Sequence, residues 1–211
     1  SAIEQIEKNH HVGWYLDKEV PLPGFYDAIL FWGDSECPFF GELDRYKTEK
    51  KGLCLSTMPT NFDNLRKLDV VFCESTPVYE AVRAQGVHAV KAFGTDTEFY
   101  TPKADVKKDI EYFYPATFSP WKRQRDVAKL GNLLLCVGKV QPDGEEDLQA
   151  CKDKGVQIEI GYFPPEKIRD YYQRAKEVVI PAVHGSERTV LEAMAMNIRP
   201  QVNINNQKAY S

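Results

Sequence analysis

The chain has 211 residues, of which 43% are hydrophobic and 27% are charged, and its formal net charge is −4. This composition excludes an intrinsically disordered chain and is typical of a globular protein with a packed core. The weak negative charge creates no overall field that would attract nucleic acid, so we expect no nucleic-acid partner. Any phosphate must then be bound by local basic groups.

The cysteines and histidines indicate which cellular compartment and which cofactors to expect. The five cysteines are an odd number without a C-x-x-C pair, and the four histidines show no metal-binding spacing. The sequence shows no signal-peptide pattern and no apolar run long enough to span a bilayer. We therefore expect buried thiols in a reducing compartment, a cytoplasmic location, and no metal or other cofactor.

The first half of the chain is predicted to alternate strands with helices, which indicates a parallel sheet covered by helices. Helix signals are clearest at Thr76, an expected cap, with Pro77 at the first helical position and Gly86 as the stop. Residues 36–51 lack a clean period and are predicted as loop and short helix. In chain order we expect a helix over 2–9, strands over 12–16, 25–32 (buried) and 51–55, a helix over 61–68, a strand over 69–73, a helix over 76–85 and a strand over 88–93.

The second half repeats the alternation after a polar stretch, residues 96–109, which we interpret as a linker between two units. We expect strands over 110–118, 133–137, 156–160 and 178–180, and helices over 122–130, 145–154 and 165–175 and from residue 187 onward. These strand–helix units predict a second doubly wound sheet. The predicted domains are therefore 1–95 and 110–211.

Four loops of the second unit are expected to converge on one rim, because ligands of open parallel sheets bind at the carboxyl ends of the strands. The loops are 117–123, 138–144, 161–165 and 181–189. No analogy to another protein is needed for this inference.

The stretch 176–200 carries the strongest local pattern, a short apolar strand, a polar loop and a helix. Backbone N–H groups and the positive end of the helix dipole at such a junction bind phosphate. Ser186 and Thr189 can cap the helix or bond an anion, and Arg188 adds a positive charge. Val190, Leu191, Met194 and Ala195 are predicted to form the apolar face of the helix. An ordinary turn between a strand and a helix explains the same pattern equally well.

Four segments together resemble the donor-binding half of GT-B glycosyltransferases, in particular the retaining family 4. They are GTDTEFYTP (94–102), ATFSPWKRQ (116–124), GYFPPEKIRDYYQRA (161–175) and HGSERTVLEAMAMNIRP (184–200). The last is the most specific, since it resembles the Glu-x7-Glu segment of that family. The resemblance implies an α/β, GT-B-like fold of two Rossmann-like doubly wound parallel-sheet domains, with the first reduced or truncated.

The resemblance also implies a function: transfer of a sugar from a UDP- or GDP-sugar to an acceptor, with retention and without metal. Glycan, lipid, protein and small-molecule acceptors all stay open, and a lipid would bring peripheral membrane contact. Cations and a helix N-terminus would stabilise the departing diphosphate, Glu192 would bind the ribose, and Tyr162 and Phe163 would flank the base. The implied substrate-binding residues are Thr117, Ser119, Lys122, Arg123, Tyr162, Phe163, Gly185, Ser186, Arg188, Thr189 and Glu192, and the implied catalytic residues are His184 and Glu187.

The sequence departs from the family pattern at two site positions. His184 replaces the first glutamate of Glu-x7-Glu, which puts activity and sugar choice in question. Thr117 stands where the family has an arginine, so one phosphate cation is missing unless Arg123, Lys139 or Arg188 replaces it. The candidates for acceptor contact in the first unit are His10, His11, Asp17 and Asp34.

Two other functions fit the same pattern. The chain could be an inactive nucleotide-binding module of glycosyltransferase fold with an assembly or regulatory role, which His184 and the short first unit favour. It could also be another two-domain Rossmann-like enzyme, such as a sugar epimerase.

Overall fold

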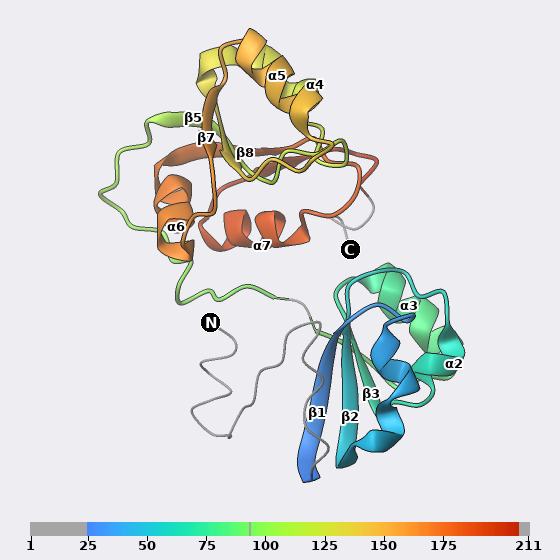
Figure 1. Ribbon diagram of the computed structural model, residues 1–211. Helices are drawn as coiled ribbons and strands as arrows, with labels where there is room; N and C mark the ends of the chain where they lie inside the picture. Colours follow the sequence, from blue (N-terminus) through green and yellow to red (C-terminus); the bar gives the residue numbers. More distant parts are fainter. Residues whose placement is uncertain (1–24, 93, 207–211) are drawn as a thin grey trace. The chain divides into compact units, whose positions relative to one another are not determined.

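A computed structural model describes residues 25–92 and 94–206, and the chain divides into two compact units between residues 93 and 94. Both units are α/β with an all-parallel sheet, which confirms the predicted fold class (Figure 1). The helix and strand predicted over 2–9 and 12–16 lie outside the described residues. No helix in the described ranges has the length and apolar character needed to cross a membrane.

The first unit contains a four-stranded sheet in the order β1-β2-β3-β4, so consecutive strands are neighbours. Its elements are β1 (Phe25–Gly33), the 3-10 turns Pro38–Gly41 and Leu43–Arg45, β2 (Lys47–Leu55), α2 (Phe62–Leu65), β3 (Val70–Cys73), α3 (Thr76–Ala84) and β4 (Ala89–Lys91). Strand β2 begins inside the stretch that was predicted as loop and short helix. Its first residues are polar and exposed, so they lack the apolar pattern that marks a strand.

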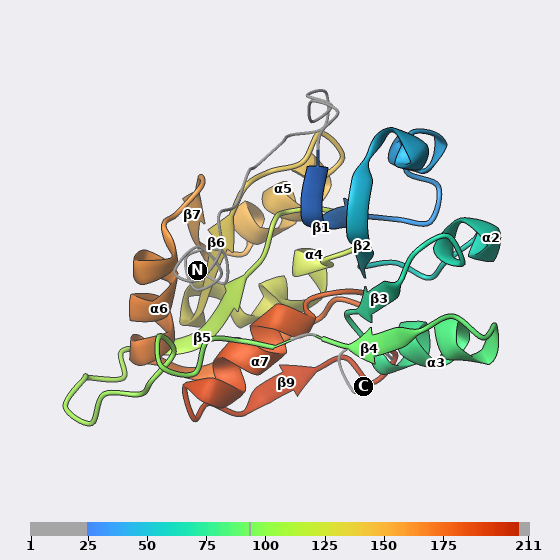
Figure 2. The same cartoon turned by 90° about the horizontal axis from the view of Figure 1, so that it is seen from below.

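One face of the first sheet carries the core of this unit. Leu53, Leu55 and Val71 are fully buried and belong to one apolar cluster with side chains of α2 and α3, and Figure 2 shows both helices on the same side of the sheet. Leu30 and Trp32, by contrast, are 55% and 67% exposed. The prediction that residues 25–32 form a buried strand is therefore wrong in its burial, because β1 is an edge strand whose Leu30 and Trp32 side chains are exposed.

Helix α3 begins one residue earlier than its signals predicted. Ser75 is the N-cap residue, Thr76 opens the helix, and Pro77 lies in the first turn, where a missing N–H costs nothing. The helix stops before Gly86, whose φ of 72° is in the left-handed region that a glycine C-cap adopts. The predicted stop is confirmed, and the predicted cap at Thr76 is corrected to Ser75.

The second unit contains a five-stranded sheet in the order β7-β6-β5-β8-β9. Its elements are β5 (Ile110–Pro115), α4 (Gln124–Val127), a 3-10 segment (Ala128–Leu133), β6 (Leu134–Gly138), α5 (Glu145–Asp153), β7 (Gln157–Ile160), α6 (Pro165–Arg174), β8 (Ala175–Ile180), α7 (Glu187–Ala195) and β9 (Pro200–Val202). In Figure 1, α4 and α5 lie on one side of this sheet and α6 and α7 on the other. The unit is therefore doubly wound, as predicted.

Three local predictions in the second unit need correction. The helix expected over 122–130 is only the short α4 followed by a 3-10 segment that breaks at Gly131, where φ is 57° and ψ is −136°. Strand β9 was not predicted; it begins at Pro200, and proline is tolerated as the first residue of a strand. In the predicted apolar face of α7, Val190 is buried and Ala195 packs against the core, but Met194 is 61% exposed, so the prediction is wrong at Met194.

The stretch predicted as a linker, residues 96–109, belongs to the second compact unit. The Tyr100 ring lies edge-on to the Tyr172 ring at 5.9 Å between centroids. The Gln173 side chain donates to the Thr101 carbonyl at 2.8 Å and accepts from the Lys103 N–H at 2.9 Å. These contacts fasten the first part of the stretch to α6.

Candidate functional site

The strand order of the second unit places its ligand crevice. Successive strands run outward from β5 in opposite directions, to β6 and β7 on one side and to β8 and β9 on the other. Such a switch point opens a crevice between the two loops that leave the adjacent strands at their carboxyl ends. These are the loops after β5 and after β8, which supply Lys122 and Ser186.

The two loops meet through a cation. Lys122 Nζ donates a hydrogen bond of 2.8 Å to Ser186 Oγ. It also lies so close to Gly185 that a Cβ built there would be 3.1 Å away. Gly185 and Ser186 both have positive φ, 74° and 70°, and this bend brings the chain into α7. The ammonium group therefore stands at the N-terminus of α7.

The N-terminus of α7 offers backbone donors to a ligand. The first intrahelical hydrogen bond runs from the Val190 N–H to the Ser186 carbonyl at 3.2 Å. The N–H groups of residues 187–189 precede it, and the first N–H groups of an α-helix have no acceptor within the helix. Together with the helix dipole, they favour an anion beside Lys122.

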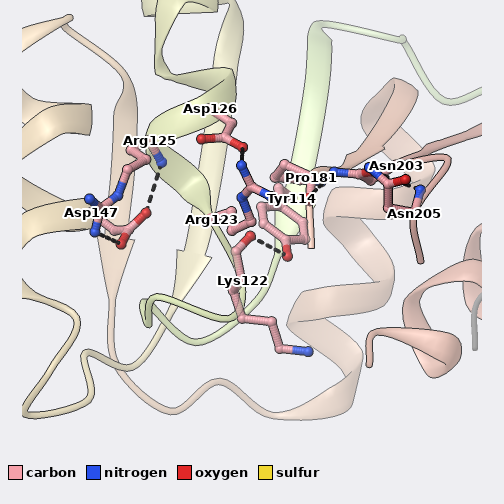
Figure 3. Close-up of polar contacts among 9 residues, drawn as sticks. All are labelled: Tyr114, Lys122, Arg123, Arg125, Asp126, Asp147, Pro181, Asn203 and Asn205. Atoms are coloured by element: carbon pink, nitrogen blue, oxygen red, sulfur yellow. Dashed lines mark hydrogen bonds and ion pairs between the residues drawn. The ribbon is translucent and has the colours of Figure 1, made fainter. Parts of the chain in front are cut away.

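The loop that carries Lys122 is fastened on several sides (Figure 3). The Tyr114 hydroxyl donates to the Lys122 carbonyl at 3.0 Å. The Arg125 guanidinium pairs with the fully buried Asp147 at 2.8 Å, and Asp147 also accepts the Arg125 N–H at 3.0 Å. In the figure the Lys122 side chain extends away from these contacts. The backbone is thus fixed independently of the ammonium group, which bonds Ser186 across the crevice.

The loop after β8 is held by two asparagines from beyond β9. Asn203 donates to the Pro181 carbonyl at 2.9 Å (Figure 3). The buried Asn206 donates to the carbonyls of Ala182 and Gly185 at 3.0 and 2.8 Å. These bonds fix the turn that presents Ser186.

Two open cavities lie along the rim. The first cavity, about 450 Å³, has Tyr162, Phe163, Arg188, Thr189 and Glu192 among its lining residues. The second cavity, about 490 Å³, is lined by Thr117, Ser119, Trp121, Lys122, Gln141, Asp143, His184 and Gly185. Thr117 and Gln141 line both cavities, so the two are neighbours.

Aromatic side chains and a cation form one part of the first cavity. Tyr162 is 82% exposed, and the Lys139 ammonium group lies 4.9 Å from the centre of its ring. The Lys167 ammonium group lies 4.4 Å from the centre of the Phe163 ring. An exposed aromatic ring backed by a cation offers a surface on which a planar heterocycle can stack.

A buried carboxylate forms another part of the first cavity. Glu192 Oε2 accepts a hydrogen bond from the buried Tyr172 hydroxyl at 2.9 Å. Burial raises the pKa of Glu192 above its usual value of 4.5, while hydrogen bonds from Tyr172 and Tyr100 and the charge of Arg188 act in the opposite direction. Burial also raises the pKa of Tyr172, so that hydroxyl stays a donor.

Ionisation of Glu192 is expected to make stability depend on pH. Because its folded-state pKa is raised, the contribution of this group is most favourable below pH 4.5 and is lost as the pH rises through the folded-state pKa. We therefore expect wild type to lose stability relative to Glu192→Gln between pH 4.5 and neutrality, in urea unfolding at a series of pH values. Glu166→Gln, at the exposed start of α6, is the control. A free energy of unfolding that rose with pH in wild type relative to Glu192→Gln would contradict this account.

Most of the predicted site residues line one of the two cavities. They are Thr117, Ser119, Lys122, Tyr162, Phe163, His184, Gly185, Arg188, Thr189 and Glu192. Ser186 acts as a partner of Lys122, and Glu187 opens α7 beside Gly185. Arg123 is ion-paired with Asp126 at 2.7 Å and lines neither cavity (Figure 3).

Of the three cations named as possible replacements for the arginine of the family pattern, Lys139 and Arg188 line the first cavity. Of the acceptor candidates, His10, His11 and Asp17 lie outside the described residues. Asp34 follows β1, and its carboxylate accepts the Glu36 N–H at 2.8 Å within a turn.

Three polar or aromatic lining residues were not singled out from the sequence: Trp121, Gln141 and Asp143. Trp121 lies inside a segment that carried the family resemblance, directly before Lys122. Gln141 and Asp143 lie in the loop 138–144, which was predicted to lie on the rim. That position was the signal by which the two residues could have been found. Within the described ranges, no three His, Cys, Asp or Glu side chains gather closely enough to hold a metal ion.

No protein-family profile and no curated protein sequence matches this chain. Solved structures match it at low identity. HepE of Anabaena, solved with UDP and glucose, has a TM-score of 0.60 and 15% identity over 83% of this chain and 58% of its own. The pneumococcal O-GlcNAc transferase GtfA, solved with UDP and GlcNAc, has a TM-score of 0.59 and 12% identity over 84% of this chain and 43% of its own.

TarM of S. aureus, solved with UDP among other ligands, has a TM-score of 0.61 and 13% identity over 81% of this chain and 40% of its own. The chain therefore spans about 40–58% of the length of these solved chains. At this level of identity, the likeness establishes the fold.

Proposed function

Because the chain has the fold of GT-B glycosyltransferases, we propose that its second unit binds a nucleotide-diphosphate sugar and that the protein transfers the sugar to an acceptor hydroxyl. The carrying observation is the bond from Lys122 Nζ to Ser186 Oγ at the N-terminus of α7. It unites a cation, a hydroxyl and a helix N-terminus at the switch point of the sheet, where an anionic ligand is expected.

The two cavities suit the two ends of such a donor. The base stacks on Tyr162, and Glu192 accepts hydrogen bonds from the ribose hydroxyls in the first cavity. The diphosphate lies against Lys122, the N–H groups of residues 187–189 and Arg188. The sugar then faces the second cavity. UDP is the nucleotide named for the similar structures, and GDP is the alternative base.

Transfer breaks the bond between sugar C1 and the diphosphate oxygen and forms a bond from C1 to the acceptor oxygen, whose proton is released. Negative charge grows on the departing diphosphate. Lys122 and the amide groups at the start of α7 stabilise that charge without a metal ion. We propose retention of configuration, with His184 and Glu187 as the catalytic candidates; His184 lines the second cavity.

A second candidate function is nucleotide binding without catalysis. The replacement of a family glutamate by His184 favours it, because that position is near the transferred sugar in the family. Slow donor hydrolysis distinguishes the two functions: an enzyme is expected to release sugar from its donor, and a pure binding module leaves the donor intact.

The test is a calorimetric panel of UDP, GDP, UDP-glucose and GDP-mannose, followed by a hydrolysis assay on the donor that binds. We expect binding of one base class, persistence of that binding in EDTA, and hydrolysis that Glu192→Ala reduces by about tenfold or more through lost ribose contacts. Glu166→Ala, on the exposed start of α6, is the matched control. Absence of binding by every ligand would overturn the proposed function.

A further inference from the structure

The second cavity contains two side chains that neither the diphosphate nor the nucleoside uses. Trp121 is 67% exposed, Asp143 is also exposed, and both residues line the second cavity. Within the described part of the chain, Asp143 has no ion-pair partner. An exposed indole on a cavity wall offers an apolar ring face on which a ligand can pack.

The two side chains stand on one rigid frame. The loop of Trp121 and the loop of Asp143 are bridged at Phe118 and Val140. The Phe118 N–H donates to the Lys139 carbonyl at 2.7 Å, and the Gln141 N–H donates to the Phe118 carbonyl at 3.0 Å. Their relative positions are therefore set by backbone bonds and not by flexible side chains.

Gly144 shows how tightly the two loops approach each other. A Cβ on this residue would lie 2.6 Å from the carbonyl carbon of Phe118. Any side chain at this position would push the two loops apart. The glycine thus keeps Asp143 close to the loop that carries Trp121.

The chemistry of this cavity matches a neutral pyranose. The C–H face of a sugar ring packs on an indole, and a carboxylate accepts strong hydrogen bonds from sugar hydroxyls. His184 and Gln141 add polar groups on the same wall. The cavity volume of about 490 Å³ falls within the range of about 300–1,000 Å³ that is typical of small-molecule sites.

We infer that the second cavity receives the hexose of the donor, with Trp121 as its platform and Asp143 as the group that selects a neutral hexose over a uronate. This inference rests on the proposed function, because Lys122 must hold the diphosphate for the sugar to reach this cavity. Selection follows from charge: the Asp143 carboxylate repels a sugar carboxylate and accepts from a hydroxyl at the same place.

The experiment measures the dissociation constants of UDP, UDP-glucose and UDP-glucuronate, or of the corresponding guanosine compounds if the panel shows GDP binding. The readout is the dissociation constant of UDP-glucose divided by that of UDP. A change in the binding of the diphosphate alters both constants by the same factor, so it does not affect this ratio. We expect Trp121→Ala and Asp143→Asn each to raise this ratio about tenfold. Asp143→Asn is also expected to narrow the preference for glucose over glucuronate.

Two control variants isolate these effects. Trp121→Phe keeps a platform and is expected to change the ratio less than threefold. Glu145→Gln removes the same charge two residues from Asp143, outside the cavity lining, and is expected to leave the ratio unchanged.

The possible failures are distinguishable. If UDP and GDP both fail to bind wild type, the proposed function falls and this inference falls with it. If the nucleotide binds and neither variant changes the ratio, only this inference is overturned.

Discussion

Replacing Lys122 by alanine is expected to weaken UDP binding by about ten- to a hundredfold, the loss of one charge-assisted hydrogen bond to a phosphate. The Lys122 ammonium group stands at the N-terminus of α7 through its 2.8 Å bond to Ser186. The loop that carries it is fastened independently of that side chain, by Tyr114 and by the pair of Arg125 with Asp147. The measurement is calorimetric titration of UDP and of uridine.

The uridine arm and two further variants make this prediction specific. Uridine lacks phosphate, so its affinity should stay within about twofold of wild type in Lys122→Ala. Lys129→Ala removes an exposed lysine that lines neither cavity and should leave UDP binding unchanged. Arg123→Ala should have a smaller effect than Lys122→Ala, because Arg123 is paired with Asp126. Undiminished UDP affinity in Lys122→Ala would refute the diphosphate assignment.

The second large effect is expected from Gly138→Ala, which should lower the free energy of unfolding of the second unit by about 2–4 kcal/mol. A Cβ on Gly138 would lie 2.7 Å from the Ala116 carbonyl carbon and closer still to its oxygen. Both neighbours are backbone atoms of Ala116, directly after β5, and Gly138 is the last residue of β6, so relief requires the two backbones to separate. Urea unfolding of the whole chain measures the change.

Gly94→Ala provides the matched control, because a Cβ there meets no atom within 4 Å. We expect its effect to stay within about 0.5 kcal/mol. A Gly138→Ala protein as stable as the Gly94→Ala protein would contradict the close strand approach described for the rim.

The predictable part of this fold is the second sheet. The apolar runs of β5, β6 and β8 are buried and bounded by glycine or proline, so their period and length identify them in the sequence. The parallel arrangement then places their loops on one rim, which is why Lys122 and the turn at Ser186 could be assigned to one site before any coordinates were known.

The less predictable part depends on tertiary contacts. In α7 the polar residues Thr189 and Glu192 are buried beside Val190, whereas Met194 is exposed. Glu192 is buried because the Tyr172 hydroxyl from α6 compensates its carboxylate. No local pattern in α7 encodes a donor that comes from another helix.

The set of residues that lines the second cavity likewise could not be predicted from the sequence. Asp143 and Trp121 line one cavity because their loops are joined where Phe118 and Val140 pair outside the regular strands. Such an isolated bridge leaves no periodic signal, and Asp143 alone is typical of an exposed turn. The rim could therefore be located from the sequence, whereas the residues that face each other across it required the structure.

The most direct test of the central claim is a crystal structure of the protein soaked with UDP. We predict electron density for the diphosphate within hydrogen-bonding distance of Lys122 Nζ and of the backbone N–H groups of residues 187–189, with the uracil on Tyr162. Density for UDP at any other place, with the Lys122–Ser186 hydrogen bond intact and no diphosphate beside it, would contradict the account.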